Sequence, residues 1–409
     1  MTALSEIQIV DYAGRQGHIS EFGDTITAGR HPDIMAKFAN GIAAAEAIST
    51  VTGSGVATTT DGYLQLSTGA AINSSNTVTS REVVRYVPGF EMYAYFTAAF
   101  VSSGVAGSTR SIAFTNGNDG FKLIDDSGTF KLQHVRTNGA VFSTYDKSRA
   151  NWEDPLDGTG ASGLNIDFSK LNIFKITLGH LGVAPVRFWI HDGSRFVQFH
   201  KFVYANIVAV PHLVNPYLKI VAKVTNTTNN LAATLRTASW QAGSVHPTPG
   251  LDSYSLDRQG FKELTLAYTA GGGAGAETPF FTLANKTAYP TGGLENFATV
   301  YVIRLQGVGE GAGANNIKLR AYKGATLSAG TTTLIDYDNL NSCVQYNLLA
   351  TAYTGGTQLF YDVASRGVPF EIDLSAVFIT IYPGEQITFT VQSSSNMTLD
   401  CAAFWTERH

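Results

Sequence analysis

The chain has 409 residues and a mass of 43.7 kDa, of which 44% are hydrophobic and only 15% charged. This hydrophobic content argues against wholesale disorder. The low charge content, against about 25% in typical domains, excludes coiled coils and helical repeats. Residues 1–250 carry 19 basic and 18 acidic residues, and residues 251–409 carry 9 and 14. No three basic residues are consecutive, so we expect no nucleic-acid partner.

The N-terminal sequence lacks the basic and then apolar regions of a signal peptide. No stretch reaches about 18 uninterrupted apolar residues, so no membrane insertion is expected. These features predict a protein that is made in a cytoplasm and leaves it, if at all, by another route, such as lysis. Cys343 and Cys401 are the only cysteines, and two reduced buried thiols are favoured over a disulfide.

Residues 1–50 differ from the rest of the chain. Glycines interrupt the first 30 residues. The spacing of apolar residues from Asp33 to Ile48 then fits a short amphipathic helix, with Asp33 as its N-cap. An extended segment lying on another subunit fits the same residues. We therefore predict that residues 1–50 form an N-terminal attachment arm, either extended or partly helical.

From residue 56 the pattern is typical of β-structure. Runs rich in β-branched and aromatic residues alternate with turn sequences such as Asp61-Gly62. Many short strands at this spacing predict a larger β-sandwich over residues 51–246, of the jelly-roll, concanavalin-like kind. The expected strands are 63–67, 83–87, 92–96, 121–124, 130–135, 174–178, 186–191, 196–202 and 218–224.

Two prolines and a glycine in the segment from His246 to Gly250 predict a linker. A second, smaller antiparallel sandwich is expected over residues 247–409. Its long loops are expected at 270–276 and 307–314. The expected strands are 263–268, 299–305, 318–322, 377–381, 386–392 and 399–405. The fold class is therefore all-β, with two sandwich domains.

A search for catalytic residues finds none. The G-x-S-x-G, P-loop and H-E-x-x-H motifs are absent. His180, His191 and His200 are interpreted as ordinary strand histidines rather than metal ligands. Glycosidases need two carboxylates about 5–9 Å apart, and Glu371 with Asp373 is one candidate pair. We predict no enzyme, no catalytic residue, no metal and no cofactor.

The segment from Asn151 to Gly160 is the one candidate ligand site. The carboxylates of Asp154 and Asp157 could hold Ca²⁺ together with Asn151 and backbone carbonyls. Trp152 could stack on a sugar ring. The favoured interpretation is structural: Asp and Gly form turns, and Trp152 closes the end of the sandwich.

Several short segments resemble a group of tailed-bacteriophage virion proteins. Residues 10–15 resemble the opening VDAFGR, and Arg85-Tyr86 with Pro88-Gly89 resembles RYQPGK, although Phe90 replaces the lysine. Asn151-Trp152, followed by residues 156–164, resembles NWNIDKLDGTGPSGI. Residues 383–385, 392–396 and 405–407 resemble the end of such proteins. The resemblance implies a place in a virion, in the head, neck, tail or a fibre, and no enzyme.

The resemblance and the composition together predict a structural virion component that assembles through protein contacts. Its expected partners are other virion proteins and further copies of this chain, as a homo-oligomer such as a trimer. The alternative is a receptor- or glycan-binding tail protein, whose partner would be a glycan of the host surface. A depolymerising enzyme acting through Asp157 or Glu371 ranks third.

Overall fold

The computed structural model describes most of the chain. The described residues are 18–19, 25–26, 29–101, 104, 106–137, 140–179, 181–229, 231–246, 258–270, 276–289, 296–311, 316–377 and 379–408. They form strands and a few short 3₁₀ turns, and no α-helix occurs among them. No helix in this part is long and apolar enough to span a membrane. The chain divides into two compact units, residues 1–248 and 249–409.

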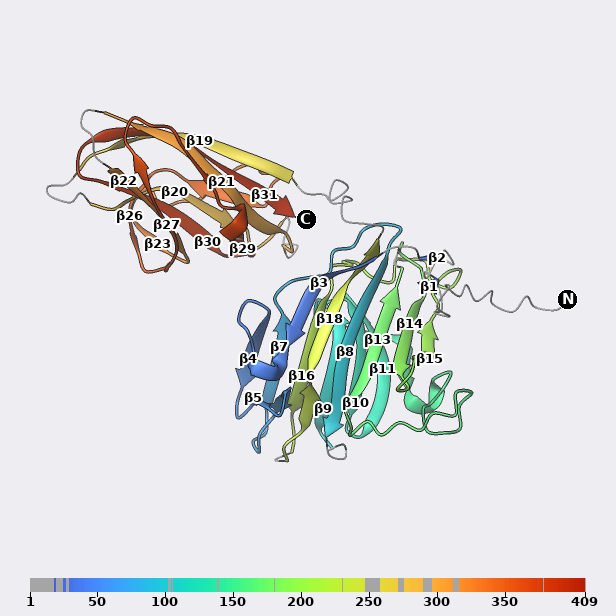
Figure 1. Cartoon of the computed structure of the whole chain (residues 1–409). Coiled ribbons are helices and arrows are strands. Elements are labelled where there is room, and N and C mark those ends of the chain that lie inside the picture. Colours follow the sequence, from blue (N-terminus) through green and yellow to red (C-terminus); the bar gives the residue numbers. More distant parts are fainter. Residues whose placement is uncertain are drawn as a thin grey trace. The chain divides into compact units, whose positions relative to one another are not determined.

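The first unit is a sandwich of two antiparallel sheets, and its first two strands form a separate two-stranded sheet (Figure 1). Its strands are β1 (His18–Ile19), β2 (Thr25–Ile26), β3 (Gly29–Lys37), β4 (Ala47–Thr52), β5 (Val56–Thr60), β6 (Tyr63–Ser67), β7 (Ser74–Ser80), β8 (Glu91–Val101), β9 (Ser108–Thr115), β10 (Gly120–Asp126), β11 (Thr129–Arg136), β12 (Ala140–Ser148), β13 (Asn172–Leu178), β14 (Val186–His191), β15 (Phe196–Phe202), β16 (Lys219–Asn226), β17 (Thr234–Thr237) and β18 (Ser239–His246).

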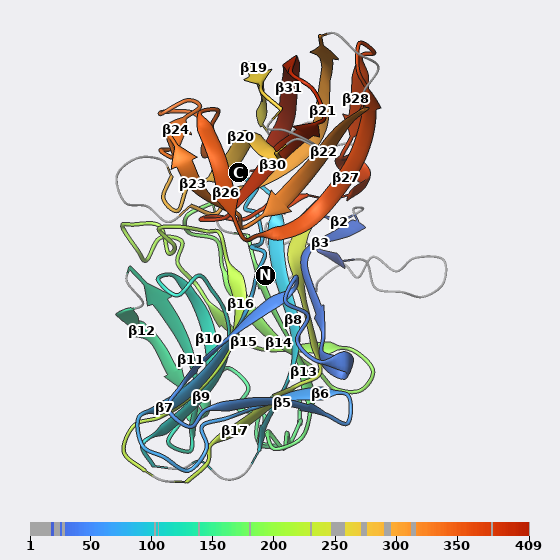
Figure 2. The same ribbon diagram turned by 90° about the vertical axis from the view of Figure 1, so that its left-hand side faces the viewer.

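Seven strands form one layer in the order β12-β11-β10-β9-β16-β7-β4. The other layer has nine strands, with β15-β14-β13-β8 on one side. The second edge of β8 pairs with β18 along its first half and with β17 near its end. Strand β18 continues to β3, and β17 continues to β6 and β5. Figure 2 separates the two layers, with β10, β11 and β12 in one and β3, β8 and β13 in the other.

Alternating side chains fill the space between these layers. Strand β7 alternates strictly between buried and half-buried residues, as expected for a sheet with one face on a core. The core is rich in aromatic rings, among them Phe96 and Phe174, whose centroids lie 6.0 Å apart. Such rings bury a large apolar area in a sandwich interior.

The second unit is a smaller sandwich with its own core. Its strands are β19 (Arg258–Tyr268), β20 (Thr278–Asn285), β21 (Thr299–Glu310), β22 (Asn316–Lys323), β23 (Thr326–Gly330), β24 (Ile335–Asp336), β25 (Val344–Asn347), β26 (Ala350–Thr354), β27 (Thr357–Ser365), β28 (Phe370–Asp373), β29 (Thr380–Ile381), β30 (Gln386–Ser393) and β31 (Met397–Arg408). One sheet has the order β19-β31-β21-β28, with β29 beside β21, and the other β24-β25-β20-β30-β22-β27. Strands β23 and β26 form a separate two-stranded sheet.

Of the two conformations expected from Asp33 to Ile48, helical or extended, the helical one is wrong. Strand β3 covers its first part, a 3₁₀ turn follows at Phe38–Asn40, and β4 begins at Ala47. Ile34, Ala36 and Phe38 are buried, whereas Met35 and Lys37 are exposed. Buried and exposed side chains therefore alternate with a period of two residues, as in a strand, and the pairing with β18 sets this alternation.

The predicted arm over residues 1–50 is too long. From residue 29 onward the chain contributes strands to both layers of the first sandwich. Residues 10–15, which carry part of the virion resemblance, lie outside the described residues, as do residues 247–250 of the predicted linker.

The predicted strands at 83–87 and 377–381 are also wrong in extent. Val84 forms only an isolated bridge with Leu218, and Pro88 follows closely. A 3₁₀ turn at Ser375–Val377 replaces the start of the second, and only β29 remains. The predicted loop at 307–314 begins inside β21, which extends to Glu310. Residues 271–275 and 312–315 lie outside the described part of the chain.

Candidate functional site

The loop from Asn151 to Gly160 uses its side chains to hold itself together. The Asn151 Nδ2 atom donates to Ser148 Oγ at 2.9 Å. Trp152 is 5% exposed, its Nε1 donates to the Lys147 carbonyl, and its ring centroid lies 5.0 Å from that of Phe199. Because the indole lies in the core, its faces are not available for stacking on a sugar from solvent.

Two of the three acidic residues of this loop, Asp154 and Asp157, close turns. Asp154 is buried and accepts backbone N–H groups from Leu156 at 3.0 Å and Ser162 at 2.7 Å. Burial raises the pKa of Asp154, but the hydrogen bonds from Ser162 and Leu156 outweigh it, so this pKa lies below its usual value. Hydrogen bonds from the Thr159 hydroxyl and N–H lower the pKa of Asp157. A general acid needs the opposite shift.

The carboxylates of Glu371 and Asp373 lie on the exposed side of β28. Glu371 pairs with Arg304 at 3.0 Å, and Asp373 accepts the Ser375 N–H at 2.8 Å. Hydrogen bonds from Ser375 lower the pKa of Asp373. No group of three or more His, Cys, Asp or Glu side chains among the described residues has a metal-binding arrangement.

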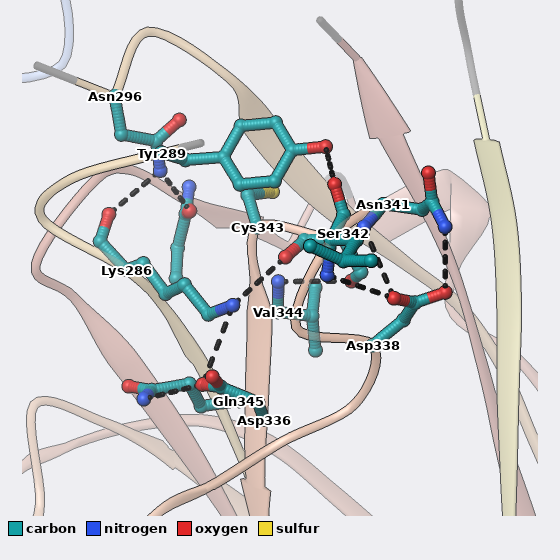
Figure 3. Close-up of polar contacts among 12 residues, drawn as sticks. Lys286, Tyr289, Asn296, Asp336, Asp338, Asn341, Ser342, Cys343, Val344 and Gln345 are labelled. Carbon is teal, nitrogen blue, oxygen red and sulfur yellow. Dashed lines mark hydrogen bonds and ion pairs between the residues drawn. The ribbon is translucent and has the colours of Figure 1, made fainter. Parts of the chain in front are cut away.

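A densely hydrogen-bonded polar cluster surrounds the loop between β24 and β25 in the second unit (Figure 3). Lys286 is 9% exposed; its Nζ donates to the Ser342 carbonyl at 3.0 Å and lies 3.3 Å from an Asp336 oxygen. Asp338 accepts the N–H groups of Leu340 and Asn341. These contacts fix the loop between β24 and β25.

The outer face of the nine-stranded sheet carries a row of side chains across six strands. The register aligns Met35, Gln241, Tyr95, Lys175, Trp189 and Gln198, on β3, β18, β8, β13, β14 and β15 respectively. These strands lie next to one another in Figure 1. We call these six residues the transverse row. At about 4.8 Å per strand it spans about 24 Å.

Aromatic rings and a cation occupy the middle of the transverse row. The Lys175 Nζ atom lies 4.2 Å from the Trp189 ring centroid and 5.1 Å from that of Phe196. The Tyr95 and Phe196 rings are 5.4 Å apart. The Trp189 Nε1 donates to Thr177 Oγ1 at 3.1 Å. Tyr95, Lys175 and Trp189 are half-buried, so the rings are held in fixed positions and still reach the surface.

A hollow of about 390 Å³ lies at the β3–β18–β8 end of the transverse row. We call it the row hollow. Its apolar surface includes Met35, 62% exposed, and Ile173, 41% exposed, beside Tyr95. Its polar lining comes from Lys37, Glu46, Thr97, Ser239 and Gln241.

The polar groups of the row hollow are largely available. The side chains of Lys37, Glu46 and Gln241 make no hydrogen bond to another side chain or carbonyl in the described residues. They offer an ammonium that donates hydrogen bonds, a carboxylate that accepts them, and an amide that both donates and accepts them. Sugar hydroxyls donate and accept, so this set suits them. Glu46 is the one carboxylate in the lining, whereas glycosidic hydrolysis commonly uses two.

Sequence reasoning did not find this site. Met35 and Gln241 are far apart in the chain and meet only through the β3–β18 register. Local signals were nevertheless present: in β13 and β14, polar or aromatic residues such as Lys175, Arg187 and Trp189 alternate with buried ones. That alternation marks a sheet whose outer face is polar and aromatic.

No protein-family model and no curated protein matches the chain. Among solved structures, a protein of unknown function from Shewanella oneidensis MR-1 is similar at 12% identity and a TM-score of 0.35, covering 52% of this chain and 85% of that one. A Bacillus licheniformis β-glucanase has 13% identity and a TM-score of 0.35, covering 53% and 99%. Lectin I-B4 from Griffonia simplicifolia has 14% identity and a TM-score of 0.33, covering 52% and 99%.

Proposed function

We propose that the first unit binds a glycan at the row hollow and along the transverse row, without cleaving it. The observation that carries this proposal is the composition of the row hollow. It combines exposed apolar surface from Met35, Tyr95 and Ile173 with available polar groups on Lys37, Glu46 and Gln241. A sugar ring presents the same combination, with apolar C–H faces and a rim of hydroxyls.

The transverse row supports an extended ligand rather than a single sugar. Its length of about 24 Å is several times that of one sugar ring. The Trp189 ring and the Lys175 ammonium provide further contacts beyond the row hollow. Rigid aromatic rings contribute contact area at a low entropic cost. Binding without cleavage is favoured because Glu46 has no second carboxylate beside it in the lining.

The experiment is a glycan array with the full chain, followed by calorimetry on the best ligand. Gln241→Ala should weaken binding about tenfold or more, because an amide that both donates and accepts is lost. The matched control is Gln259→Ala, an exposed glutamine on β19 in the second unit. Trp152→Ala is a poor probe, because it removes a core ring.

Two outcomes would contradict the proposal. One is an array of bacterial, plant and animal glycans with no reproducible ligand. The other is a ligand whose affinity is the same for Gln241→Ala, Gln259→Ala and the unchanged chain. Release of shorter saccharides from the bound glycan would instead revive the enzyme interpretation.

A place in a phage virion is a second proposal, and it rests on the sequence resemblance of residues 85–89 and 151–164. Glycan binding is compatible with it, since a tail protein could use a surface glycan as receptor. The test is copy number in purified particles by quantitative mass spectrometry. Hundreds of copies would indicate the head, and roughly three to eighteen the neck, tail or a fibre. Absence from particles would overturn it.

A further inference from the structure

A second hollow, of about 870 Å³, opens at another part of the first unit. It is formed by the ends of β6, β8 and β17, the β10–β11 turn and the loop before β13. We call it the basic hollow. It shares no lining residue with the row hollow. Its lining includes four cationic side chains, on Arg110, Arg149, Lys170 and Arg236.

Arg110 is already neutralised. It is 2% exposed, and its guanidinium pairs with the Asp125 carboxylate, with Nε to Oδ2 at 2.9 Å. It also donates to the carbonyl oxygens of Val101 and Thr234. Because these bonds hold it rigidly, Arg110 forms part of the wall and contributes no net charge to the basic hollow.

Arg149 and Arg236 are half-buried, and each is held over an aromatic ring. The Arg149 Cζ lies 4.9 Å from the Phe168 centroid, and its Nε and Nη2 donate to the Pro155 and Leu156 carbonyls. The Arg236 Cζ lies 4.7 Å from the Tyr63 centroid, and its Nε donates to Gln65 Oε1 at 2.8 Å. Both guanidinium planes are thus oriented before any ligand arrives.

Some N–H donors of these two guanidiniums have no acceptor within the described part of the chain. None of Arg149, Lys170 and Arg236 forms an ion pair there, and both Nη atoms of Arg236 lack a hydrogen-bond acceptor. One carboxylate, Asp167, lines the same hollow and accepts the Ser169 N–H at 2.9 Å. The three cations outweigh it, so the basic hollow carries a net positive charge.

From this geometry we infer that the basic hollow is a binding site for a carboxylated sugar, such as a uronic or sialic acid. Arginine binds a carboxylate through two parallel N–H donors, and a stacked, preoriented guanidinium loses little entropy on doing so. The available Nη donors of Arg236 and the Lys170 ammonium are the groups that would hold the carboxylate.

The size and lining of the basic hollow favour a sugar acid over a free inorganic anion. A volume of about 870 Å³ lies in the range of sites for small organic ligands. Its wall includes apolar surface from Phe130 and Leu171, the latter 48% exposed. Such surface suits the C–H face of a sugar ring and offers nothing to a phosphate ion.

The test is titration of the full chain with sodium glucuronate and with N-acetylneuraminate, followed by NMR or calorimetry. Glucose and inorganic phosphate serve as the neutral and the non-sugar probes. Both sugar acids should bind at least about tenfold more tightly than either of these. Raising NaCl from about 0.05 to about 0.5 M should weaken the binding, because added salt screens the charges.

Arg236→Gln should weaken binding of both acids about tenfold or more, and Arg236→Lys should retain part of it. The matched control is Arg195→Gln on the β14–β15 turn, where the arginine is 69% exposed. The melting temperature of each variant shows that it is folded. Equal affinity for phosphate, or an Arg236→Gln variant that binds the sugar acids like the unchanged chain, would overturn the inference. Neither result bears on the proposal for the row hollow, because that proposal is tested through Gln241, which lines the row hollow and not the basic hollow.

Discussion

The two sandwiches hold their buried charges in different ways. The first unit encloses a complete ion pair, Arg110 with Asp125, each 2% exposed. The second unit encloses a carboxylate, Glu407, which is 1% exposed. Its oxygens accept the Ser342 hydroxyl at 2.6 Å and the Cys343 N–H at 2.8 Å, both neutral donors.

The two units also differ in their histidines. The first unit buries three imidazoles, on His134, His200 and His212. The second unit has one histidine in its sequence, His409, at the end of the chain. The described ion pairs of the second unit each include a side chain that is at least 22% exposed. We therefore expect the stability of the first unit to depend more on buried charge pairing and on histidine protonation than that of the second unit. Each prediction below tests this difference.

The largest effect is expected from Asp125→Ala. It removes the carboxylate that pairs with the buried Arg110 guanidinium, and also the acceptor of the Gly128 N–H. Breaking one partner of a buried pair costs about 3–5 kcal/mol. We expect hydrogen exchange to accelerate in peptides from residues 29–246 and to stay unchanged in those from 258–408.

The matched control for this change is the neighbouring Asp126→Ala. Asp126 pairs with Lys131 at 2.9 Å but is 39% exposed, so its removal should cost less than about 1 kcal/mol. Equal losses for the two variants would mean that burial of the Arg110–Asp125 pair does not set its contribution. A loss that spreads to the second unit would mean that the two units do not unfold independently.

Acidification from pH 7 to pH 5 should produce the next largest effect, mainly in the first unit. Burial lowers the pKa of His134 to about 4 and that of His200 to about 4. A hydrogen bond to the His212 carbonyl and the charge of Asp119 partly oppose the shift at His134, and Lys147 adds to the shift at His200. Both folded-state pKa values lie below the value of about 6.5 in an unfolded chain.

The unfolded chain therefore binds protons first as the pH falls. The stabilisation is fully present above pH of about 6.5 and is lost as the pH falls toward about 4. From pH 7 to pH 5 we expect a loss of about 2 kcal/mol for each of the two histidines. Urea unfolding at several pH values measures it. His134→Gln should remove about half of the pH slope; an unchanged slope would assign the acid sensitivity to other groups.

Local sequence was sufficient for much of the fold. The β14–β15 hairpin has the predicted bounds because the Asp192-Gly193-Ser194 turn leaves little freedom: the Asp192 Oδ1 accepts the Ser194 and Arg195 N–H groups. The two free, buried cysteines agree with the prediction as well. Burial raises the pKa of Cys401 to about 12, which keeps it protonated and unreactive.

Other elements depend on contacts that local sequence does not contain. Strands β4, β5 and β7 are rich in Ser and Thr and carry weak hydrophobic patterns, so they form because neighbouring strands offer hydrogen-bond partners. The apolar spacing within β3 fits a helix, and its pairing with β18 makes the segment a strand. The transverse row and the basic hollow are both assembled from residues far apart in the chain, which sequence patterns alone do not bring together.

The smallest effect is expected from Glu371→Gln in the second unit, and it is informative for that reason. Glu371 pairs with Arg304 at 3.0 Å, as close as many buried pairs, yet the two side chains are 62% and 38% exposed. Water competes for both charges and two long side chains must be ordered, so such pairs contribute about 0–1 kcal/mol. The Arg304 guanidinium also keeps a contact with the Phe404 ring, 4.4 Å from its centroid, after the carboxylate is lost.

We expect the free energy of unfolding of Glu371→Gln, measured in urea, to differ from that of the unchanged chain by no more than about 0.5 kcal/mol, at pH 7 and pH 5 alike. A loss of several kcal/mol would show that the second unit relies on charge pairing as much as the first, and the contrast between the two sandwiches would then lie in their histidines alone.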